Sequence, residues 1–476
     1  MHSFELKILY RTALNRRKDY MYDIIIIGAG TAGISAYKEA IKYTQNILII
    51  NKGPWDTTCA RVGCMPSKVL ISSANRMHDI QYTQEVGLNT QATIDTSQVM
   101  QRVRALRDKF SQATLNDVNQ WDPSHKISGQ AQFINANTVE VNGQLFQAKS
   151  FILAVGSTPN TDAALKEELQ ERLITSDQIF ELETLPKSLA VIGSGVIAIE
   201  LAQAMHRLGV ETTIFARSSK VGSLTSPALQ TLAQQEIAKE LNIKFGILPD
   251  HIKRTELGVE LTYHKTLLVA DYVFSAIGRT SNLHTLQLNQ INAEYTDIAH
   301  LPINLDTKQL GDYPIFVIGD AFTEAPLQHE AATDGKLSVH NCLSYPNTKN
   351  IHSVTPLAIV FCTPEMAIIG QSHRNLSQTK VDFVTGRVSY EKQGRAMVLG
   401  KNQGAAEIYV DRVSRKILGA ELFVEAAEHL AHLLAWMISE HLTVDEILKK
   451  PFYHPTLEEG LRTALKHAHR QLPKLV

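Results

Sequence analysis

Short runs of apolar residues bounded by glycine recur along the chain and predict the buried strands of parallel sheets. Residues 22–27 contain four consecutive isoleucines. A glycine-rich turn follows, then a helix to about residue 42 and a second strand at 47–50. The same order of strand, turn, helix and strand recurs from residue 189 to 215. Two such units predict an α/β protein built on two parallel sheets.

Three later apolar runs, at residues 151–155, 272–277 and 315–318, predict further buried strands, each of which ends at or beside a glycine. Residues 129–141 alternate between apolar and polar positions and predict a small antiparallel meander. We expect mainly helix and coil between the first βαβ unit and that meander.

The C-terminal quarter has a different pattern, because strands precede helices there instead of alternating with them. The stretch from Pro346 to Pro356 is polar and punctuated by prolines, which indicates a linker. The rest predicts an α+β domain. We expect strands near 357–362, 381–388, 396–400, 405–410 and 416–423, and helices at 425–440, 443–449 and 456–467.

Composition narrows the function classes. The chain has 476 residues, which suggests roughly three domains. A formal net charge of −1 does not predict a nucleic acid or a membrane surface as a partner. With only four cysteines the chain does not resemble a secreted disulfide scaffold, and we expect a reducing compartment, the cytoplasm. The basic residues within 1–20 would also fit a presequence, but we interpret this stretch as a loose tail.

Both predicted turns carry a nucleotide-binding glycine pattern. In G-x-G-x-x-G, the first glycine allows the tight turn, the second lets the backbone approach a pyrophosphate, and the third lets helix and strand pack closely. The pattern alone is a weak signal, but here a strand precedes it and a helix follows. The first turn has Gly28, Gly30 and Gly33, and the second has Gly193, Gly195 and Ala198.

The residues after each second strand are unusual, because an acid that binds a ribose hydroxyl is expected there. The first unit has Asn51 and Lys52, and an asparagine can still bind a hydroxyl without charge assistance. The second unit has Ala216 and Arg217, where an arginine suits a 2′-phosphate or is simply a solvated surface charge. Asp320 follows the strand at 315–318, at the edge where such sheets bind ligands.

Cys59 and Cys64, separated by four residues, are the candidate reactive pair. Their spacing does not suit a zinc site, but it allows a disulfide if the backbone bends or a helix begins there. The apolar residues after Cys64 place it near a predicted helix start, where amide dipoles favour a thiolate. The alternative is a pair of buried structural cysteines.

Together with His454, Pro455, Thr456 and Glu459 near the C-terminus, these motifs resemble the flavoprotein disulfide reductases over residues 21 to about 467. The resemblance is greatest to dihydrolipoamide dehydrogenases, because residues 329–335 are similar to their helix after the second flavin motif. It implies two Rossmann-like domains that bind FAD and NAD(P), and an α+β C-terminal dimerisation domain. The implied division is a tail at 1–20, an FAD domain at 21–157, an NAD(P) domain at 158–280, a central domain at 281–350 that completes the FAD site, and an interface domain at 351–476.

The same resemblance implies roles for individual residues. Cys64 is the thiol nearer the flavin, and Cys59 exchanges with the substrate. His454 is the acid–base catalyst, oriented by Glu459, and both act in the site of the partner subunit of a homodimer. Lys68 faces the flavin and pairs with Glu200. No metal is implied, and the residues implied to bind cofactors are Gly28, Gly30, Gly33, Asn51, Lys52, Thr58, Ala131, Gly156, Asp320, His329, Gly193, Gly195, Ala198, Ala216, Arg217 and Gly278.

The activity implied is electron transfer between NAD(P)(H), FAD, a Cys59–Cys64 disulfide and a small dithiol or disulfide, with a lipoyl domain as one candidate partner. A dihydrolipoyl dehydrogenase is the main hypothesis, and an NADPH-dependent reductase of glutathione or another small disulfide is the alternative. A third hypothesis is a non-catalytic flavoprotein subunit. No cysteine pair follows His454, unlike in mercuric reductases. Thr57 and Thr58 replace the family's usual glycine pair, and Ser223 stands where glutathione reductases have a second arginine.

Overall fold

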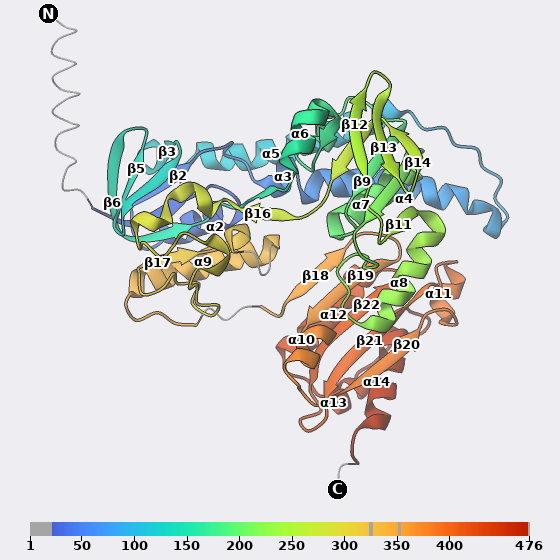
Figure 1. Cartoon of the computed structure of the whole chain (residues 1–476). Helices are drawn as coiled ribbons and strands as arrows, with labels where there is room; N and C mark the ends of the chain where they lie inside the picture. Colours follow the sequence, from blue (N-terminus) through green and yellow to red (C-terminus); the bar gives the residue numbers. More distant parts are fainter. Residues whose placement is uncertain (1–20, 323–326, 351–353, 475–476) are drawn as a thin grey trace, which may run out of the picture. The chain divides into compact units, whose positions relative to one another are not determined.

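The computed structural model describes residues 21–322, 327–350 and 354–474 (Figure 1). These residues form two compact units. The first consists of described residues within 1–61, 108–158 and 279–353, and the second of those within 62–107, 159–278 and 354–476. Each unit combines parts of more than one predicted domain, so the predicted domain boundaries stay a prediction. The predicted N-terminal tail lies outside the described residues.

The first unit contains, in its described residues, a seven-stranded sheet in the order β3-β2-β1-β6-β5-β4, with β17 also beside β6. The strands β1, β2, β3, β6 and β17 are parallel to their neighbours in this group, and β4, β5 and β6 form the predicted antiparallel meander. Their bounds are β1 (Met21–Ile27), β2 (Ile47–Asn51), β3 (Lys126–Ser128), β4 (Ala131–Asn135), β5 (Thr138–Val141), β6 (Gln144–Leu153) and β17 (Ile315–Val317).

Both faces of this sheet are buried, which explains the isoleucine run. Ile24 and Ile26 belong to a core that includes residues of α2 (Thr31–Ala40) and α9 (Gln328–Ser344), two helices that lie side by side (Figure 1). Ile25 and Ile27 point to the opposite face and pack with the meander. Successive residues of a strand alternate between faces, so a strand covered on both sides is apolar throughout.

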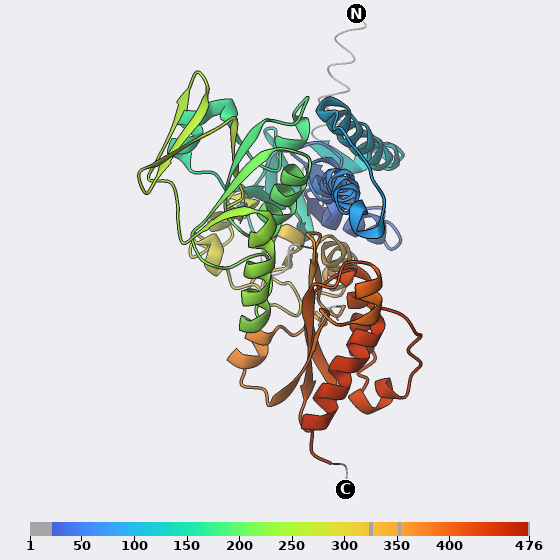
Figure 2. The same ribbon diagram turned by 90° about the vertical axis from the view of Figure 1, so that its right-hand side faces the viewer.

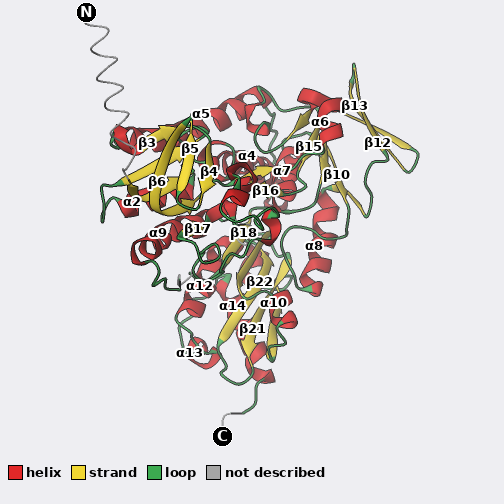
Figure 3. Cartoon of the chain, turned by 60° about the vertical axis from the view of Figure 1, so that its left-hand side comes forward, coloured by secondary structure: helices red, strands yellow, loops and turns green. Residues whose placement is uncertain are grey.

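The second unit contains a parallel sheet in the order β11-β10-β9-β15-β8. Figure 3 labels β10 and β15 of this sheet. Helix α7 (Val196–Arg207) connects β9 to β10 as predicted, and α4 (Cys64–Gln81) packs against α7. A separate antiparallel sheet, β12-β13-β14, lies in the same stretch of chain. The strands are β8 (Leu173–Ile174), β9 (Ser188–Ile192), β10 (Glu211–Ala216), β11 (Asn242–Phe245), β12 (His251–Thr255), β13 (Gly258–Tyr263), β14 (Thr266–Ala270) and β15 (Tyr272–Ser275).

The C-terminal part of the second unit is an antiparallel sheet in the order β18-β19-β22-β21-β20. Helices α12, α13 and α14 share a hydrophobic core with one face, and Figure 2 shows the red helices along that sheet. Helices α8 (Pro227–Glu240) and α10 (His373–Gln378) contact β22. The remaining bounds are β18 (Leu357–Val360), β19 (Glu365–Gly370), β20 (Phe383–Ser389), β21 (Gly404–Asp411), β22 (Ile417–Val424), α12 (Ala427–Ser439), α13 (Val444–Leu448) and α14 (Glu458–Gln471).

Two details of the predicted C-terminal domain are wrong. Residues 394–398 form a short helix, α11 (Gly394–Val398), instead of a strand near 396–400. The Gln393 side chain accepts a hydrogen bond from Ala396 N at 2.7 Å and caps this helix, while Met397 and Val398 are exposed. The strand β19 was not predicted. Among the described residues, no helix has the length and apolar character that a membrane span requires.

Candidate functional site

The first glycine turn, between β1 and α2, leaves room for a phosphate. Gly28 has φ +108°, and a Cβ there would lie 2.2 Å from the Ala154 carbonyl oxygen. A Cβ on Gly33 would lie 1.8 Å from the Gly28 oxygen, so both positions require glycine. Gly30 has no heavy atom within 4 Å of its Cβ position, and no side chain caps the helix there. An open helix N-terminus suits a pyrophosphate, so the turn fits FAD.

Asn51, at the end of β2, is hydrogen bonded to the backbone of this turn and of the residues that follow β2. Its Oδ1 accepts a hydrogen bond from Ala29 N at 3.1 Å. Its Nδ2 donates to the Gly53 and Pro54 oxygens at 2.9 and 2.8 Å. Both amide hydrogens are therefore engaged, and the side chain is 9% exposed. Asn51 can accept a further hydrogen bond from a ribose hydroxyl, but it has no hydrogen left to donate.

Asp320 lies on the short helix η8 (Gly319–Ala321), next to the first turn of α2. A Cβ on Gly319 would lie 2.9 Å from the Ala32 Cβ, so η8 and the glycine turn are neighbours. Ser157 Oγ donates to Asp320 Oδ2 at 3.3 Å. Gly156 follows β6 with φ +67° and an open Cβ position. These predicted residues come together within the first unit.

The other residues predicted on the FAD side differ in environment. Ala131, the first residue of β4 in the meander, is buried in the core. Lys52 is exposed, and so is Thr58, the first residue of α3 (Thr58–Arg61). His329 is an exposed residue in the first turn of α9.

The second glycine turn, between β9 and α7, has nearly the same backbone. Gly193 has φ +119°, and its Cβ would lie 2.4 Å from the Ala276 oxygen. Gly195 has φ −74° and ψ −172°, against −75° and −172° at Gly30, and its Cβ position is also open. Ala198 is fully buried where the first turn has Gly33. The turn fits a second dinucleotide.

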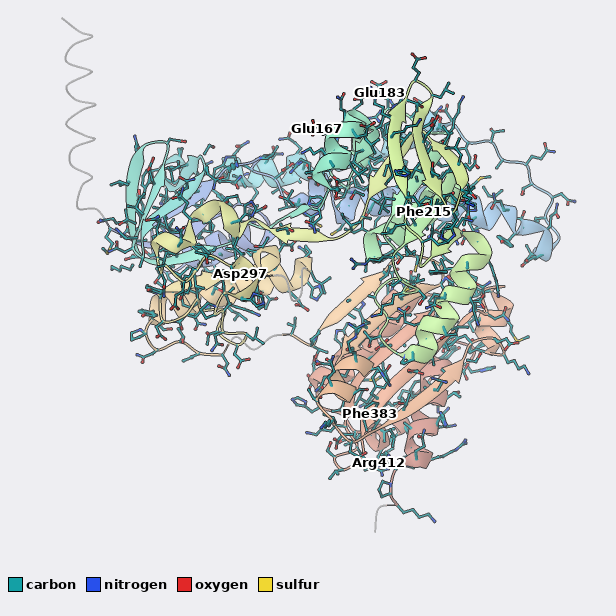
Figure 4. All side chains as sticks on the ribbon, viewed as in Figure 1. Glu167, Glu183, Phe215, Asp297, Phe383 and Arg412 are labelled. Atoms are coloured by element: carbon teal, nitrogen blue, oxygen red, sulfur yellow. The ribbon has the colours of Figure 1, made fainter. Side chains whose placement is uncertain are left out.

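The end of β10 lies beside this second turn, because Gly193 N donates to the Phe215 oxygen at 2.9 Å (Figure 4). Ala216 is buried and Arg217 is exposed. Gly278, the remaining predicted residue, has φ +108° and follows Ala276 after β15. The structure therefore brings the second group of predicted cofactor residues together within the second unit.

Lys68 and Glu200 form the predicted pair. Lys68 Nζ lies 2.7 Å from Glu200 Oε2, and the Glu200 side chain is only 6% exposed. Phe361 N donates to the other carboxylate oxygen at 2.8 Å, and the Lys68 ammonium lies 4.5 Å from the centre of the Phe361 ring. Lys68 thus pairs with the buried carboxylate of Glu200, and both carboxylate oxygens accept hydrogen bonds. Phe361 could not be predicted as a partner, because its contribution is a backbone N–H.

The cysteines occupy different environments. Cys64 is exposed and is the first residue of α4, as predicted, and Cys59 is half-buried on α3. Cys342 and Cys362 are buried. Burial raises the pKa of the Cys342 thiol, and burial and nearby Glu200 raise the pKa of the Cys362 thiol. Among the four, the helix-start position favours the thiolate at Cys64.

His454 and Glu459 are directly paired. His454 Nδ1 lies 3.0 Å from Glu459 Oε2, while the His454 side chain is 81% exposed. Hydrogen bonds from Thr456 N and from the His454 ring hold the pKa of Glu459 below its ordinary value. Glu459 therefore stays ionised near neutral pH and fixes the ring through Nδ1, which leaves Nε2 for proton transfer.

Two residues that the sequence did not indicate, the buried Tyr390 and the half-buried Gln393, hold the loop between His454 and α14. Tyr390 OH donates to the Leu457 oxygen at 3.0 Å, and Gln393 Nε2 donates to the Thr456 oxygen at 2.7 Å. A Cβ on Gly460 would lie 2.4 Å from the Tyr390 ring, so that position requires a glycine. No local pattern links these residues to His454, because they lie 63 and 67 positions from their bonding partners.

Comparison with known proteins gives one family for nearly the whole chain. Residues 22–335 match the pyridine nucleotide-disulphide oxidoreductase model, and residues 357–465 match the dimerisation domain of that family. A mercuric reductase from Lysinibacillus sphaericus is 28% identical over 95% of this chain and 84% of its own length. A dihydrolipoyl dehydrogenase from Geobacillus stearothermophilus is 28% identical over 92% of this chain and 94% of its own length.

Solved structures share the fold. LpdA from Mycobacterium tuberculosis superposes with a TM-score of 0.80 at 21% identity, over 94% of this chain and 99% of its own. The HOCl-induced flavoprotein disulfide reductase RclA from Escherichia coli has a TM-score of 0.74 at 18% identity, over 95% and 100%. The predicted fold class is confirmed. The chain belongs to the pyridine nucleotide-disulphide oxidoreductases, flavoenzymes that use FAD and NAD(P)H.

Proposed function

We propose that this protein transfers two electrons between NAD(P)H and a small disulfide and acts as a dihydrolipoyl dehydrogenase. In the reductive direction, NAD(P)H and one proton convert one disulfide into two thiols. The reverse reaction oxidises a dithiol and yields NAD(P)H and a proton. A 30 mV difference in potential is about 1.4 kcal/mol for two electrons, so the supply of reactants sets the direction.

The observation that carries the proposal is the exposed acid–base pair. His454 is held through Nδ1 by Glu459 at 3.0 Å, and its ring is otherwise open to the surroundings. An imidazole fixed in this way suits proton transfer to and from sulfur near neutral pH. The pair lies within residues 357–465, which match a dimerisation domain and support a homodimer. We infer that His454 serves the partner subunit.

The cysteines would carry the exchange. The Cys59 thiolate attacks one sulfur of the substrate disulfide and forms a mixed disulfide, and His454 protonates the substrate thiolate that leaves. The Cys64 thiolate then attacks the Cys59 sulfur of the mixed disulfide, which forms the Cys59–Cys64 disulfide and releases the second substrate thiolate, which takes a proton from solvent. Bound FAD supplies the two-electron link between the nicotinamide and the cysteine pair. Gly28, Gly30 and Gly33 would hold its pyrophosphate.

A second candidate is an NADPH-dependent reductase of glutathione or another small disulfide. The observation that favours this candidate is the exposure of Arg217 directly after β10, at the position where NAD-specific sites have an acid. One well-aligned arginine contributes roughly 1.5–3 kcal/mol to binding a phosphate. We therefore expect NADPH to be accepted at least as well as NADH.

A steady-state assay distinguishes these candidates. Lipoamide, dihydrolipoamide and oxidised glutathione are each tested with the matching redox form of NAD(H) and NADP(H). The main proposal predicts that the lipoamide pair is turned over with a kcat/KM well above that of glutathione. Higher kcat/KM for glutathione would favour the second candidate. A Cys59→Ser variant with unchanged turnover of every disulfide would contradict both.

Sharing of the site between subunits has its own test. A chain carrying His454→Gln is mixed with a chain carrying Cys59→Ser, and verified heterodimers are isolated. Each heterodimer then contains one site with both residues intact if His454 acts across the interface. We expect part of the wild-type activity to return, and heterodimers as inactive as the two parents would contradict the sharing.

A further inference from the structure

The loop that follows β10 is anchored at several points although its first residues are exposed. It runs from Arg217 to Ser226 and connects β10 to α8. Residues 217–220 are exposed and include two cations, Arg217 and Lys220. Ser223 is no third donor on the surface, because its Oγ is buried without a hydrogen-bond partner among the described residues. The second half of the loop turns into the protein.

The glycine turn holds the middle of this loop. Ser194, between Gly193 and Gly195, donates through Oγ to the Lys220 oxygen at 2.6 Å. Its own oxygen accepts from Gly222 N at 2.9 Å. Two hydrogen bonds therefore join the second glycine turn to the Arg217–Ser226 loop.

Gln230, on the first turns of α8, holds the loop from the other side. Its Nε2 donates to the Val221 and Leu224 oxygens at 2.8 and 2.7 Å, and its Oε1 accepts from Val221 N at 3.1 Å. The residue is 9% exposed. All three bonds are to backbone groups, two of them on Val221, which follows Lys220, and one on Leu224, so the side chain fixes the path of the chain.

Glu421, on β22 of the C-terminal sheet, holds the end of the loop. It is 0% exposed and accepts hydrogen bonds from Thr225 N, Thr225 Oγ1 and Ser226 N. His373 N, at the start of α10, donates to the same carboxylate at 2.9 Å. Four donors stabilise the buried charge. The end of the loop is therefore fixed by a residue that lies 196 positions away in sequence.

We propose that Gln230 and Glu421 are positioning residues for nucleotide choice, which hold the Arg217–Ser226 loop in a preformed shape that presents Arg217 to the 2′-phosphate of NADPH. The inference rests on the proposed use of NADPH by this site. A preformed loop loses little conformational entropy when the phosphate binds, whereas a loosened loop must be ordered first. Weakening either anchor should therefore lower affinity for the 2′-phosphate selectively.

Binding of two fragments to the FAD-loaded enzyme tests this without turnover. Adenosine 2′,5′-bisphosphate carries the 2′-phosphate, and 5′-AMP lacks it, so the ratio of their Kd values isolates that group. We expect Gln230→Leu to weaken the bisphosphate about fivefold to tenfold, which is part of the effect of losing a whole charge-assisted contact, and 5′-AMP less than about twofold. Gln235→Leu, the same change at an exposed position of α8, should alter neither. Glu421→Gln provides a second variant with a smaller shift of the same sign.

The Arg217→Ala background separates positioning from general damage. There the effect of Gln230→Leu on the ratio should vanish, because the group being positioned is gone. Equal weakening of both fragments, or the same loss of selectivity with and without Arg217, would overturn the inference. A wild-type preference that Arg217→Ala abolishes and Gln230→Leu leaves intact would overturn it while the NADPH proposal stands. A wild-type enzyme with no preference for the bisphosphate would overturn both.

Discussion

The two glycine turns have almost the same backbone but differ in what surrounds it. Gly28 has φ +108° and Gly193 has φ +119°. Each turn also passes close to the carbonyl oxygen of a residue that follows a neighbouring strand. The third position is Gly33 in the first turn and Ala198 in the second. A Cβ is impossible at Gly33, 1.8 Å from a backbone oxygen, while Ala198 is packed in the core. Helix and turn are therefore closer in the first unit.

The residues at the end of the second strand of each βαβ unit, β2 and β10, differ more in their surroundings than the turns do. Asn51 is turned inward and satisfies the backbone of its own turn, whereas Arg217 is turned outward at the start of an anchored loop. In the first turn this position therefore helps to build the site, and in the second it is exposed, where we propose that Arg217 contacts the nucleotide. The comparison shows that the same glycine pattern gives the same turn backbone, while the residue after the second strand can have a different environment in each unit; we propose that this residue decides nucleotide selection.

Exchanging the third residues of the two turns should have the largest effect. Gly33→Ala forces a Cβ into the Gly28 oxygen, so we expect loss of bound FAD and a marked fall in Tm. Flavin absorbance per chain and thermal unfolding measure both. Ala198→Gly is the matched control and should cost only about 1 kcal/mol through helix propensity. A Gly33→Ala protein with full flavin content would contradict the close packing of the first turn.

Asn51 should matter for stability where Arg217 does not. Asn51→Leu removes the acceptor of the buried Ala29 N and the donors to the Gly53 and Pro54 oxygens, which should lower the free energy of unfolding by about 1–3 kcal/mol and weaken FAD binding. Denaturant unfolding and flavin titration measure these effects. Arg217→Leu, at the corresponding exposed position, should stay within about 0.5 kcal/mol of wild type. Equal stability changes in the two variants would remove the distinction between the turns.

Charge reversal at Arg217 tests whether the residue after β10 selects between NADPH and NADH. Arg217→Glu should shift the ratio of kcat/KM for NADPH over NADH toward NADH by about tenfold to hundredfold, because a carboxylate repels the 2′-phosphate. Asn51→Glu should leave the ratio unchanged. Wild-type preference for NADH by more than about tenfold would mean that Arg217 is only a surface charge.

Glu365, outside both turns, offers a smaller, pH-dependent effect on stability alone. Burial raises the pKa of Glu365 to about 7, although Glu428 N donates to it. The folded protein then keeps a proton that the unfolded chain releases above about pH 4.5, so stability declines as pH rises from there to about 7. Glu365→Gln should therefore be more stable by on the order of 1–2 kcal/mol at pH 8 and equal near pH 4.5. Denaturant midpoints across this range measure it, and a difference independent of pH would contradict the shift.

Features that depend on a local sequence pattern, such as the glycine turns and the helix start at Cys64, agree with the prediction. The glycines at 28 and 193 adopt the positive φ that the turns require, and Cys64 begins its helix as predicted. The Lys68–Glu200 and His454–Glu459 contacts are confirmed. These pairs could be predicted because the resemblance covers both members.

What could not be predicted depends on contacts between distant strands and loops. The ribose contact expected of Asn51 stays a prediction, and the hydrogen bonds from its amide to the Gly53 and Pro54 oxygens of its own turn had no signal in the sequence. Glu421 reaches Thr225 only because β22 runs beside α8, which no local pattern encodes. The strand predicted near 396–400 is wrong, because Met397 and Val398 are exposed on a capped helix. Burial of an apolar residue is a property of the fold and not of its neighbours in sequence.

The central claim is that Cys59 and Cys64 form a redox-active pair coupled to NAD(P)H through FAD. The most direct test is alkylation of the FAD-loaded enzyme under denaturing conditions, before and after anaerobic reduction with one equivalent of NADPH, followed by mass spectrometry of each cysteine. We predict that Cys59 and Cys64 are alkylated only after reduction, while Cys342 and Cys362 are alkylated in both samples. Equal alkylation of Cys59 and Cys64 before and after NADPH would contradict the claim.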